Sequence, residues 1–280
     1  MSVTTVSGGS RTPQRETVIA QRRGPVLVLT LNRPERLNAW NDELEDRCFA
    51  LLAKADADPE VRAIVLTGAG RGFCAGADMD DLRQVGEVGA ATDLAALDLP
   101  KRERPRWFPL TLRKPLIAAI NGAAAGLGLV QALYCDIRLS TPDAKLTTAF
   151  ARRGLIAEYG IAWLLPRLVG PGRAMDLLLS GRVVRGTEAY EMGLVNRVVE
   201  PELLLDAAVD YATDLATWCS PASMSVMKRQ VLQALDTDFA TAAGTADALM
   251  LEAFRHPDAT EGVTSYLERR APAFRPLDPK

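Results

Sequence analysis

The stretch PLIAAINGAAAGLGLVQAL, from Pro115 to Leu133, decides the fold. It starts with an apolar run, Leu116 to Ile120, which has the length of a buried strand. The turn signal Asn121-Gly122 and two further glycines follow, and then Leu129 to Leu133 shows helical spacing. Such a strand, turn and helix start expose backbone N–H groups that can hold a negatively charged oxygen. A close-packed turn, in which glycines only relieve crowding, explains the stretch on its own as well.

Composition and charge are those of an ordinary globular chain of 280 residues, with 48% hydrophobic and 24% charged residues. The net charge of −2 provides no basic field, so we expect no nucleic-acid partner. No apolar run reaches the roughly 18 to 20 residues that span a bilayer, so we expect no membrane partner. The N-terminal segment lacks the apolar core of a signal peptide, and residues 1–15 are predicted to be a disordered tail.

The four cysteines and the single histidine narrow the chemistry. No two cysteines form a CxxC pair, so a zinc site is not expected, and reduced thiols indicate a cytoplasmic protein. His256 is the only histidine, and it stands beside a Pro-Asp turn. We interpret it as a surface or capping residue, which leaves no candidate for a histidine-dependent nucleophile.

Strands and helices alternate through the first 200 residues, which predicts a layered α/β fold. The predicted strands are Val26–Leu31, Ala63–Leu66, Leu116–Ile120, Cys135–Leu139, Ala144–Thr148 and Val195–Val199. Helices are predicted after Asn41 or Asp42 and at Ile161–Val169, where Pro166 should interrupt or kink the helix, Arg173–Leu179 and Glu188–Met192. From residue 201 onward only helices are expected: Glu202–Trp218, Ala222–Leu235, Thr241–Phe254 and Ala259–Arg270. The predicted organisation is a core domain at 16–200 and a helical C-terminal module at 201–280.

A second glycine-rich turn, GAGRGFCAGADMDDL, runs from Gly68 to Leu82. It lacks the Lys-Ser/Thr of a P-loop and the spacing of a dinucleotide-binding motif. It is nevertheless a second place where backbone N–H groups can converge on an anion. We read Asp78, Asp80 and Asp81 as helix-capping and solvated residues. Residues 84–114 are weakly patterned and fit either a surface loop or a cover over an apolar ligand with a charged end.

Glu158 is the carboxylate of interest. It lies in GLIAEYG among apolar residues, just before Gly160. A carboxyl group in apolar surroundings has a raised pKa and can exchange protons near neutrality. The alternative is a glutamate at a helix N-terminus that faces water.

Taken together, these motifs resemble the crotonase superfamily, also called the enoyl-CoA hydratase/isomerase family. The resemblance covers the chain from about Val26 to Phe274. It rests on the segments LNRPERLNA, IVLTGAGRGFCAGADM, KPLIAAINGAAAGLGL with CDIRLS, GLIAEYG with LLPRLVG, and GLVNRVV. It implies a spiral of repeated ββα turns followed by helices that build homotrimers, often paired into hexamers.

The resemblance also implies an acyl-CoA thioester substrate, with coenzyme A as part of the substrate and no separate cofactor or metal. It places an oxyanion hole at the backbone N–H groups of Ala77 and Leu127. Arg36 and Asn38 fall where the family holds the nucleotide end of CoA. Phe274 and Arg275 fall where a neighbouring subunit adds to that site. The remaining residues expected at the substrate are Ala75, Gly76, Asp78, Gly126, Val130 and Phe150.

The chain departs from the two-glutamate hydratases of this family. Val130 and Phe150 stand where those enzymes carry their two glutamates, whereas Glu158 falls where single-acid isomerases place theirs. We therefore expect Δ3,Δ2-enoyl-CoA isomerisation with Glu158 as proton shuttle, because one carboxylate can remove a proton from C2 and return it at C4. An apolar wall of Val130 and Phe150 should raise the pKa of Glu158 and exclude water.

Three alternatives stay open. One is hydration of a 2-enoyl-CoA with Glu158 as the only acid/base. A second is a non-catalytic acyl-CoA-binding or scaffold protein, which predicts that Glu158 faces solvent. A third uses the same oxyanion hole for thioester hydrolysis or another acyl-CoA reaction, for which Asp78 and Asp80 are the near candidates.

Overall fold

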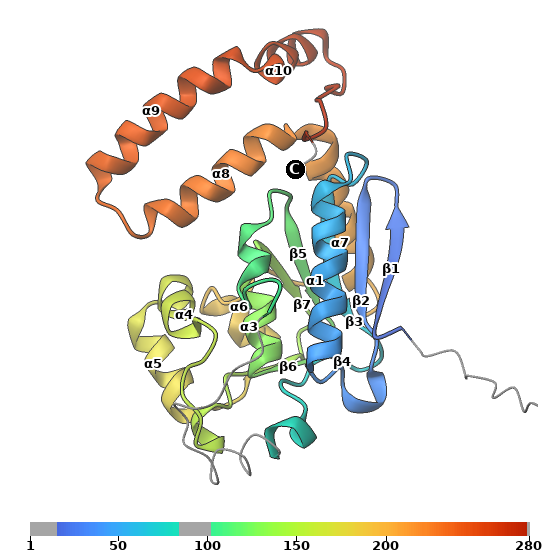
Figure 1. Cartoon of the computed structure of the whole chain (residues 1–280), viewed down its shortest axis with the longest axis vertical. Coiled ribbons are helices and arrows are strands. Elements are labelled where there is room, and N and C mark those ends of the chain that lie inside the picture. The colour runs from blue at the N-terminus through green and yellow to red at the C-terminus, as the bar shows by residue number, and fades with distance from the viewer. Residues whose placement is uncertain (1–15, 84–101, 279–280) are drawn as a thin grey trace, which may run out of the picture.

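The computed structural model describes residues 16–83 and 102–278, and its strands form two sheets (Figure 1). The larger sheet has six strands in the order β1-β2-β3-β5-β7-β10, and the smaller has four in the order β4-β6-β8-β9. Neighbours are parallel except for β1 with β2 and β8 with β9. The strands are Val18–Arg23 (β1), Val26–Leu31 (β2), Ala63–Gly68 (β3), Gly72–Cys74 (β4), Leu116–Ile120 (β5), Ala123–Ala125 (β6), Ile137–Ser140 (β7), Lys145–Thr147 (β8), Val184–Arg185 (β9) and Arg197–Val198 (β10).

Helices fill the connections between strands and the whole C-terminal part of the chain. Pro166 lies inside α4 and does not end it, since Gly170 still donates its N–H to the Pro166 carbonyl. The α-helices are Asp42–Ala57 (α1), Leu127–Leu133 (α3), Ile161–Val169 (α4), Pro171–Ser180 (α5), Gly186–Glu191 (α6), Leu204–Trp218 (α7), Pro221–Ala234 (α8), Phe239–Arg255 (α9) and Pro257–Glu268 (α10). Short 3-10 turns are Pro34–Arg36 (η1), Phe108–Thr111 (η3) and Ala151–Arg153 (η4). In the described residues no helix is both long and apolar enough to cross a membrane.

Successive strand pairs step from one sheet to the other. In each of β3–β4, β5–β6 and β7–β8, the first strand joins the large sheet and the second joins the small one. Asn121 links two of these corners, because its side-chain amide donates to the carbonyls of Gly68 at 2.9 Å and Gly70 at 3.0 Å. The repeated step is a spiral of ββα turns, which confirms the predicted α/β fold.

Helix α1 covers one face of the large sheet. Leu29 and Ile64 of the sheet and Leu44, Cys48 and Leu52 of the helix are all buried in one apolar cluster. The Asn41 side chain caps this helix by accepting the N–H of Leu44. Each fully buried leucine or isoleucine contributes about 1.5 to 3 kcal/mol to folding, so this layer anchors the core.

Helix α7 covers the opposite face, where Val28 and Val65 of the sheet pack against Ala208 and Ala212. The predicted domain division at residue 200 lies before this helix. The change in packing comes after it, at Cys219, because α7 completes the cover of the sheet. The segment that leaves the core is therefore α8 to α10, which we call the arm.

The arm extends away from the two sheets (Figure 1). Its middle helix α9 has no buried residue among those described. Ser220 and Asp238 cap α8 and α9 with their side chains. His256 caps α10 by accepting the N–H of Asp258 at 3.2 Å, which confirms the predicted capping role. Phe274 is buried and lies against Gly262 of its own arm.

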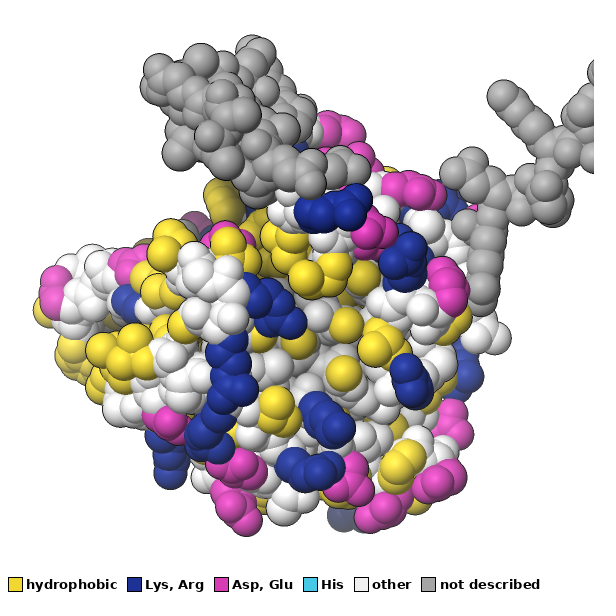
Figure 2. All heavy atoms as spheres, turned by 90° about the horizontal axis from the view of Figure 1, so that it is seen from below, with side chains coloured by type: hydrophobic (Ala, Val, Ile, Leu, Met, Phe, Trp, Pro, Cys, Tyr) yellow, Lys and Arg dark blue, Asp and Glu magenta, His cyan; other side chains and the backbone are white. Residues whose placement is uncertain are grey.

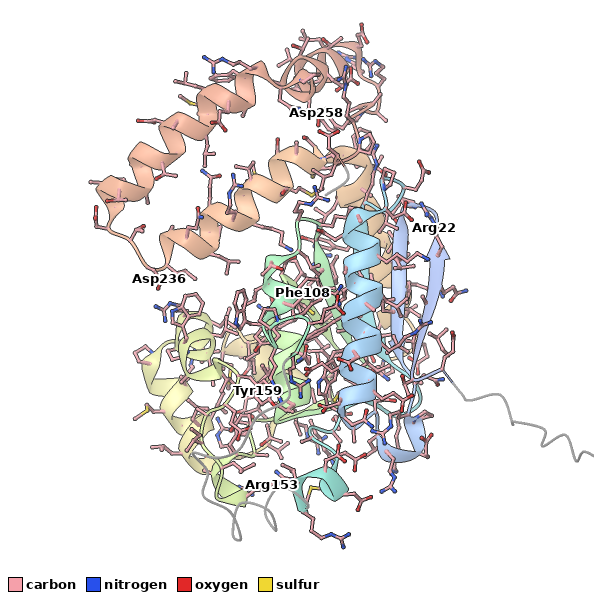
Figure 3. The ribbon with its side chains drawn as sticks, in the orientation of Figure 1. Arg22, Phe108, Arg153, Tyr159, Asp236 and Asp258 are labelled. Atoms are coloured by element: carbon pink, nitrogen blue, oxygen red, sulfur yellow. The ribbon has the colours of Figure 1, made fainter. Side chains whose placement is uncertain are left out.

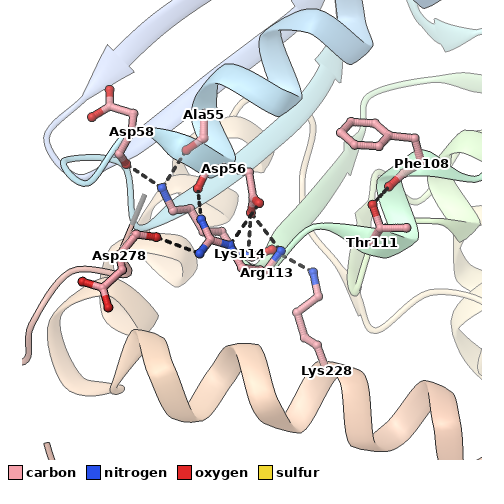
Figure 4. Close-up of polar contacts among 9 residues, drawn as sticks. All are labelled: Ala55, Asp56, Asp58, Phe108, Thr111, Arg113, Lys114, Lys228 and Asp278. Carbon is pink, nitrogen blue, oxygen red and sulfur yellow. Dashed lines mark hydrogen bonds and ion pairs between the residues drawn. The ribbon is translucent and has the colours of Figure 1, made fainter. Parts of the chain in front are cut away.

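A polar clamp fixes the chain where it enters β5 (Figure 4). The Asp56 carboxylate accepts the backbone N–H groups of Arg113 and Lys114 at 2.8 and 3.2 Å. The Lys114 ammonium donates to the carbonyl of Ala55 at 2.7 Å, and burial lowers its pKa to about 8. Lys228 of α8 donates to the Lys114 carbonyl and so ties the arm to the same point. The clamp fixes the start of the strand that leads into the glycine turn at 121–128.

The sequence predicted little structure for residues 1–15 and 84–114, and the structure describes only the last part of the second segment. The tail 1–15 and residues 84–101 lie outside the described part of the chain. Within residues 102–114, by contrast, two residues pack against the core: the Phe108 ring lies 5.6 Å from the Phe49 ring of α1, centroid to centroid, and Leu112 is buried. Strands β1, β4, β6 and β9 are additions to the sequence-based prediction.

Candidate active site

A cavity of about 420 Å³ lies between the two glycine-rich turns. It is lined by four groups of residues: the first turn at 75–79, the second turn at 126–127, the segment 148–158, and the rim residues around η1. Figure 2 looks onto this end of the molecule and shows Lys and Arg side chains spread across it. Arg36, Arg71 and Arg153 are the arginines that line the cavity.

The first turn brings Ala77 to the cavity lining. On either side of Ala77 the backbone is paired with Trp40, which donates to the Gly76 carbonyl at 2.7 Å and accepts the N–H of Asp78 at 2.9 Å. Ala77 lies between these bonds, and its own N–H has no acceptor among the described residues. Gly76 has a φ of +103°, and a Cβ there would lie 2.8 Å from the carbonyl oxygen of Ala125. Only glycine fits this position.

Arg33 anchors the same turn. Its guanidinium binds the Asp78 carboxylate at 2.8 Å and the carbonyl of Ala39 at 2.6 Å. Asp78 also accepts the N–H of Asp80 at 3.2 Å, which confirms its predicted capping role at the helix start. Burial by itself would raise the pKa of Asp78, but the hydrogen bonds from Arg33 and Asp80 hold it below its ordinary value. Asp78 is thus a paired, ionised anchor.

The second turn presents the N–H of Leu127 at the start of α3. Gly126 has φ +48° and ψ −118°, and its own N–H is bound to the Thr147 carbonyl at 3.0 Å. The next glycine, Gly128, packs so closely on β4 that a Cβ would lie 2.0 Å from the Cys74 carbonyl oxygen. The N–H of Leu127 has no acceptor in the described chain. Two unpaired N–H donors, from two turns locked together by backbone contact, therefore border one cavity.

Glu158 borders the same cavity on a short segment before α4, and its side chain is half-buried. Its carboxylate has no hydrogen bond or ion pair within residues 16–83 and 102–278. Burial raises the pKa of Glu158, and the positive charge of Arg106 partly opposes this rise. The following residues hold the backbone: Tyr159 adopts φ +57°, and its carbonyl accepts the hydroxyl of Tyr134 at 2.6 Å.

Most residues expected at the substrate do line the cavity. These are Arg36, Ala75, Gly76, Ala77, Asp78, Gly126, Leu127, Phe150 and Glu158. Val130 and Asn38 do not. Val130 is wholly buried in the core, because its position on α3 turns it toward the sheets. Of the two residues expected to form an apolar wall beside Glu158, Phe150 lines the cavity together with Leu155, whereas Val130 does not.

The Asn38 side chain forms hydrogen bonds with the backbone, a role that the sequence did not indicate. It is completely buried, and its amide donates to the carbonyls of Gly72 at 2.8 Å and Ala69 at 3.0 Å. Its side-chain oxygen accepts the N–H of Arg33 at 2.9 Å. Asn38 thus fixes the corner between β3 and β4 and lies behind the cavity wall.

Several cavity residues were missed at the sequence level, notably Arg71, Arg153 and Leu155. Arg153 lies at the end of η4, at the same end of the molecule as the cavity (Figure 3). The only sequence signal for it is its nearness to the GLIAEYG motif.

Comparison with known proteins gives a consistent result. Residues 21–276 match the family model described as enoyl-CoA hydratase/isomerase. A 1,2-epoxyphenylacetyl-CoA isomerase from Escherichia coli (strain K12) is 39% identical over 92% of this chain and 98% of its own. A solved enoyl-CoA hydratase from Mycobacterium marinum is 48% identical over 78% of this chain and 97% of its own, with a TM-score of 0.65. A probable enoyl-CoA hydratase/isomerase from Mycobacterium abscessus is 32% identical over 93% and 99%, with a TM-score of 0.83.

Proposed function

Because this chain belongs to the enoyl-CoA hydratase/isomerase family and is an enzyme of the isomerase/lyase kind, we propose that it isomerises 3-enoyl-CoA thioesters to 2-enoyl-CoA thioesters with Glu158 as the proton shuttle. The observation that carries the proposal is one carboxylate of raised pKa that lines the same cavity as two backbone N–H groups, all three without a partner among the described residues. The alternative of a non-catalytic acyl-CoA binder predicts a Glu158 that faces solvent, whereas its side chain is half-buried.

The electrostatics of the cavity separate the roles of Asp78 and Glu158. Asp78 is paired with Arg33 and its pKa is low, so it stays ionised and poorly basic. Glu158 has a raised pKa, which brings it closer to neutrality, where a carboxyl both accepts and returns a proton efficiently. Two carboxyl groups with oppositely shifted pKa values are typical of a site in which one acts as the acid/base.

The proposed reaction needs no water and no added group. The Glu158 carboxylate takes a proton from C2, and the electron pair of that C–H bond moves into the thioester, giving a dienolate with its charge on oxygen. The N–H groups of Ala77 and Leu127 donate to that oxygen. Protonated Glu158 then returns the proton to C4, so that the double bond lies between C2 and C3. Each preorganised donor is worth roughly 3 kcal/mol in such a site.

Hydration of a 2-enoyl-CoA is the second candidate. It is favoured by the partial exposure of Glu158, which leaves room for a water molecule at the carboxylate. In that reaction Glu158 would direct the water to C3 and supply the proton for C2. The names of the similar proteins include both isomerases and hydratases.

The rim of the cavity supports an acyl-CoA substrate. Arg36, Arg71 and Arg153 surround the opening, and guanidinium groups bind phosphates well. We propose that they hold the phosphates of CoA while the thioester reaches the two N–H groups. Arg36 already lies 3.4 Å from the Asp80 carboxylate, an exposed pair that a phosphate can replace at small cost.

We also propose a homotrimer, or a dimer of trimers, built through the arm. A groove of about 800 Å³ runs between α8, α9 and α10 and is lined largely by apolar side chains, among them Met227, Met250 and Phe254. These three side chains are 59%, 47% and 69% exposed in the single chain. Contiguous exposed apolar surface of this kind is typical of a subunit interface.

The test compares wild type and Glu158→Gln with 3-hexenoyl-CoA and with crotonyl-CoA. We expect wild type to convert 3-hexenoyl-CoA faster than it hydrates crotonyl-CoA, and the variant to lose about a hundred- to ten-thousand-fold in kcat, the range of a general acid/base. Glu35→Gln is the matched control, because Glu35 is another carboxylate that lines this cavity. Unchanged turnover in Glu158→Gln, or an equal loss in both variants, would reject Glu158 as the shuttle.

A further inference from the structure

Three arginines precede η3, and Arg106 differs from the other two. Arg102 binds carboxylates of α1 at 2.5 and 2.6 Å, and Arg104 binds Glu103 at 2.7 Å. Arg106 is half-buried and has no carboxylate partner in an ion pair within the described chain. Its guanidinium instead lies over the ring of Tyr159, with the central carbon 4.5 Å from the ring centroid.

Tyr159 connects this contact to the acid of the site, since it follows Glu158 directly. Its backbone is in the left-handed region, at φ +57°, which is unfavourable for a residue other than glycine. The Tyr134 hydroxyl holds the Tyr159 carbonyl, and the N–H of Ile161 holds the Glu158 carbonyl at 3.1 Å. Arg106 stacks on the ring, so this unfavourable turn is held on both its backbone and its side chain (Figure 3 labels Tyr159).

We propose that Arg106 is a positioning residue for the reaction: its guanidinium fixes Tyr159, and with it the turn that carries Glu158, and its charge stabilises the Glu158 carboxylate. The inference rests on the proposed function of Glu158. A cation stacked on an aromatic face is attracted to the ring, so Arg106 can hold the turn without a direct ion pair to the catalytic acid. A direct pair would keep Glu158 ionised and weaken it as a base.

The charge balance around Glu158 sets the expected direction. Burial raises the pKa of Glu158 and Arg106 lowers it, with a net result above the ordinary value. Burial lowers the pKa of Arg106, which also depends on the charges of Arg102, Glu45 and Asp42. The other charged side chains on the cavity are Glu35, Arg36, Arg71, Asp78 and Arg153. Removing the Arg106 charge should raise the pKa of Glu158 further, so that less of it is carboxylate at a given pH.

The experiment measures kcat/KM against pH for wild type, Arg106→Met and Arg106→Lys. Methionine keeps an apolar stem without the charge, and lysine keeps the charge without the planar group. We expect the acid limb of the Arg106→Met profile to move to higher pH, so that the loss relative to wild type grows as pH falls. Arg106→Lys should restore much of this shift. A loss of the same size at every pH, or a lysine variant no better than methionine, would overturn the proposal.

Arg167→Met is the matched control, because Arg167 makes the same kind of contact with Trp163, at 4.0 Å, away from the cavity lining. Its pH profile should coincide with that of wild type. A second readout is independent of turnover: carbon-13 NMR of labelled glutamate carboxyls, with the Glu158 signal assigned by its absence in Glu158→Gln. A Glu158 titration that is unchanged in Arg106→Met refutes the inference. Retained activity in Glu158→Gln refutes the proposed function instead.

Discussion

The cavity in the core and the groove of the arm differ in the polarity of the residues that line them. The cavity between the glycine turns is bordered by backbone N–H groups, arginines and Glu158, and every wall comes from elements that pack on one another. The groove of the arm is lined mainly by apolar side chains, and its helix α9 has no buried residue among those described. Polar groups that are held in place without a hydrogen-bond partner can bind and react with a substrate. Exposed apolar surface favours association with another subunit. This difference is the reason why we propose the reaction in the core and subunit association through the arm.

After the loss of Glu158 itself, the largest expected effect comes from disturbing the first turn with Gly76→Ala. The added Cβ would lie 2.8 Å from the Ala125 carbonyl oxygen, and φ +103° is strained for alanine, so the N–H of Ala77 must move. We expect a loss of about a hundred- to a thousand-fold in kcat, the effect of losing one oxyanion donor. Steady-state kinetics checks this, at a temperature at which wild type and variant are both folded.

Gly172→Ala, in α5, is the control for that variant, since a Cβ at Gly172 meets nothing within 4 Å. It should keep full activity and gain slightly in stability, because alanine favours a helix over glycine. If both glycine variants have equal kcat, the turn does not orient a catalytic donor.

Charging the groove should break assembly while sparing the site. Phe254→Asp places a carboxylate where a 69% exposed phenyl ring lines the groove. Burying an unpaired charge in an interface costs several kcal/mol, so we expect the oligomer to dissociate at micromolar concentration. Light scattering after size-exclusion chromatography measures this, with Phe254→Leu as the apolar control. A variant that stays fully assembled would move the interface elsewhere.

A smaller effect is expected for Asp78→Asn, which breaks the anchored pair with Arg33. The folded state lowers the pKa of Asp78, so its contribution to stability is present above the unfolded value of about 3.9 and is lost as pH falls through the folded value. At pH 7 we expect a loss of roughly 2 kcal/mol, seen as a lower Tm. Asp80→Asn should be nearly neutral, because its ion pair with Arg36 is exposed. Equal effects of the two variants would deny Asp78 its anchoring role.

The smallest effect should be a gain in Tm for Glu158→Gln. Because the folded state raises the pKa of Glu158, the carboxylate costs stability once the pH exceeds the unfolded value of about 4.3. The glutamine variant should therefore be slightly more stable than wild type at pH 7, and the difference should vanish below pH 4. Calorimetry at both values checks the sign. A variant that is less stable at pH 7 would mean that Glu158 is structurally paired.

Much of this architecture could be read from the sequence. Val26–Leu31, Leu116–Ile120 and Ile161–Val169 were predicted with the bounds that the structure shows, because long apolar runs are bounded there by turn residues. Strand β1 was not predicted from the sequence, because it is an edge strand in which only Val18 is buried. Strands β4, β6 and β9 were not predicted because two or three residues are too few to show a period.

The site was predictable in its turns and less so in its side chains. The glycines at 76 and 126 showed where bare N–H groups would lie, because few other residues permit such backbone. Val130 and Asn38 were expected at the substrate, yet both are buried and neither lines the cavity. Which way a residue points from α3, or whether an asparagine binds backbone, depends on tertiary packing. The contact of Arg106 with Tyr159 joins segments 53 positions apart in the chain and had no local signal.

The most direct test of the central claim follows 3-hexenoyl-CoA in heavy water by proton NMR. We expect that a hydrogen is lost from C2 and that a double bond appears between C2 and C3, with no hydroxyl at C3. We also expect that Glu158→Gln loses this conversion while remaining folded. The claim is contradicted if 3-hexenoyl-CoA stays unchanged while crotonyl-CoA gains a hydroxyl at C3, or if the glutamine variant still moves the double bond.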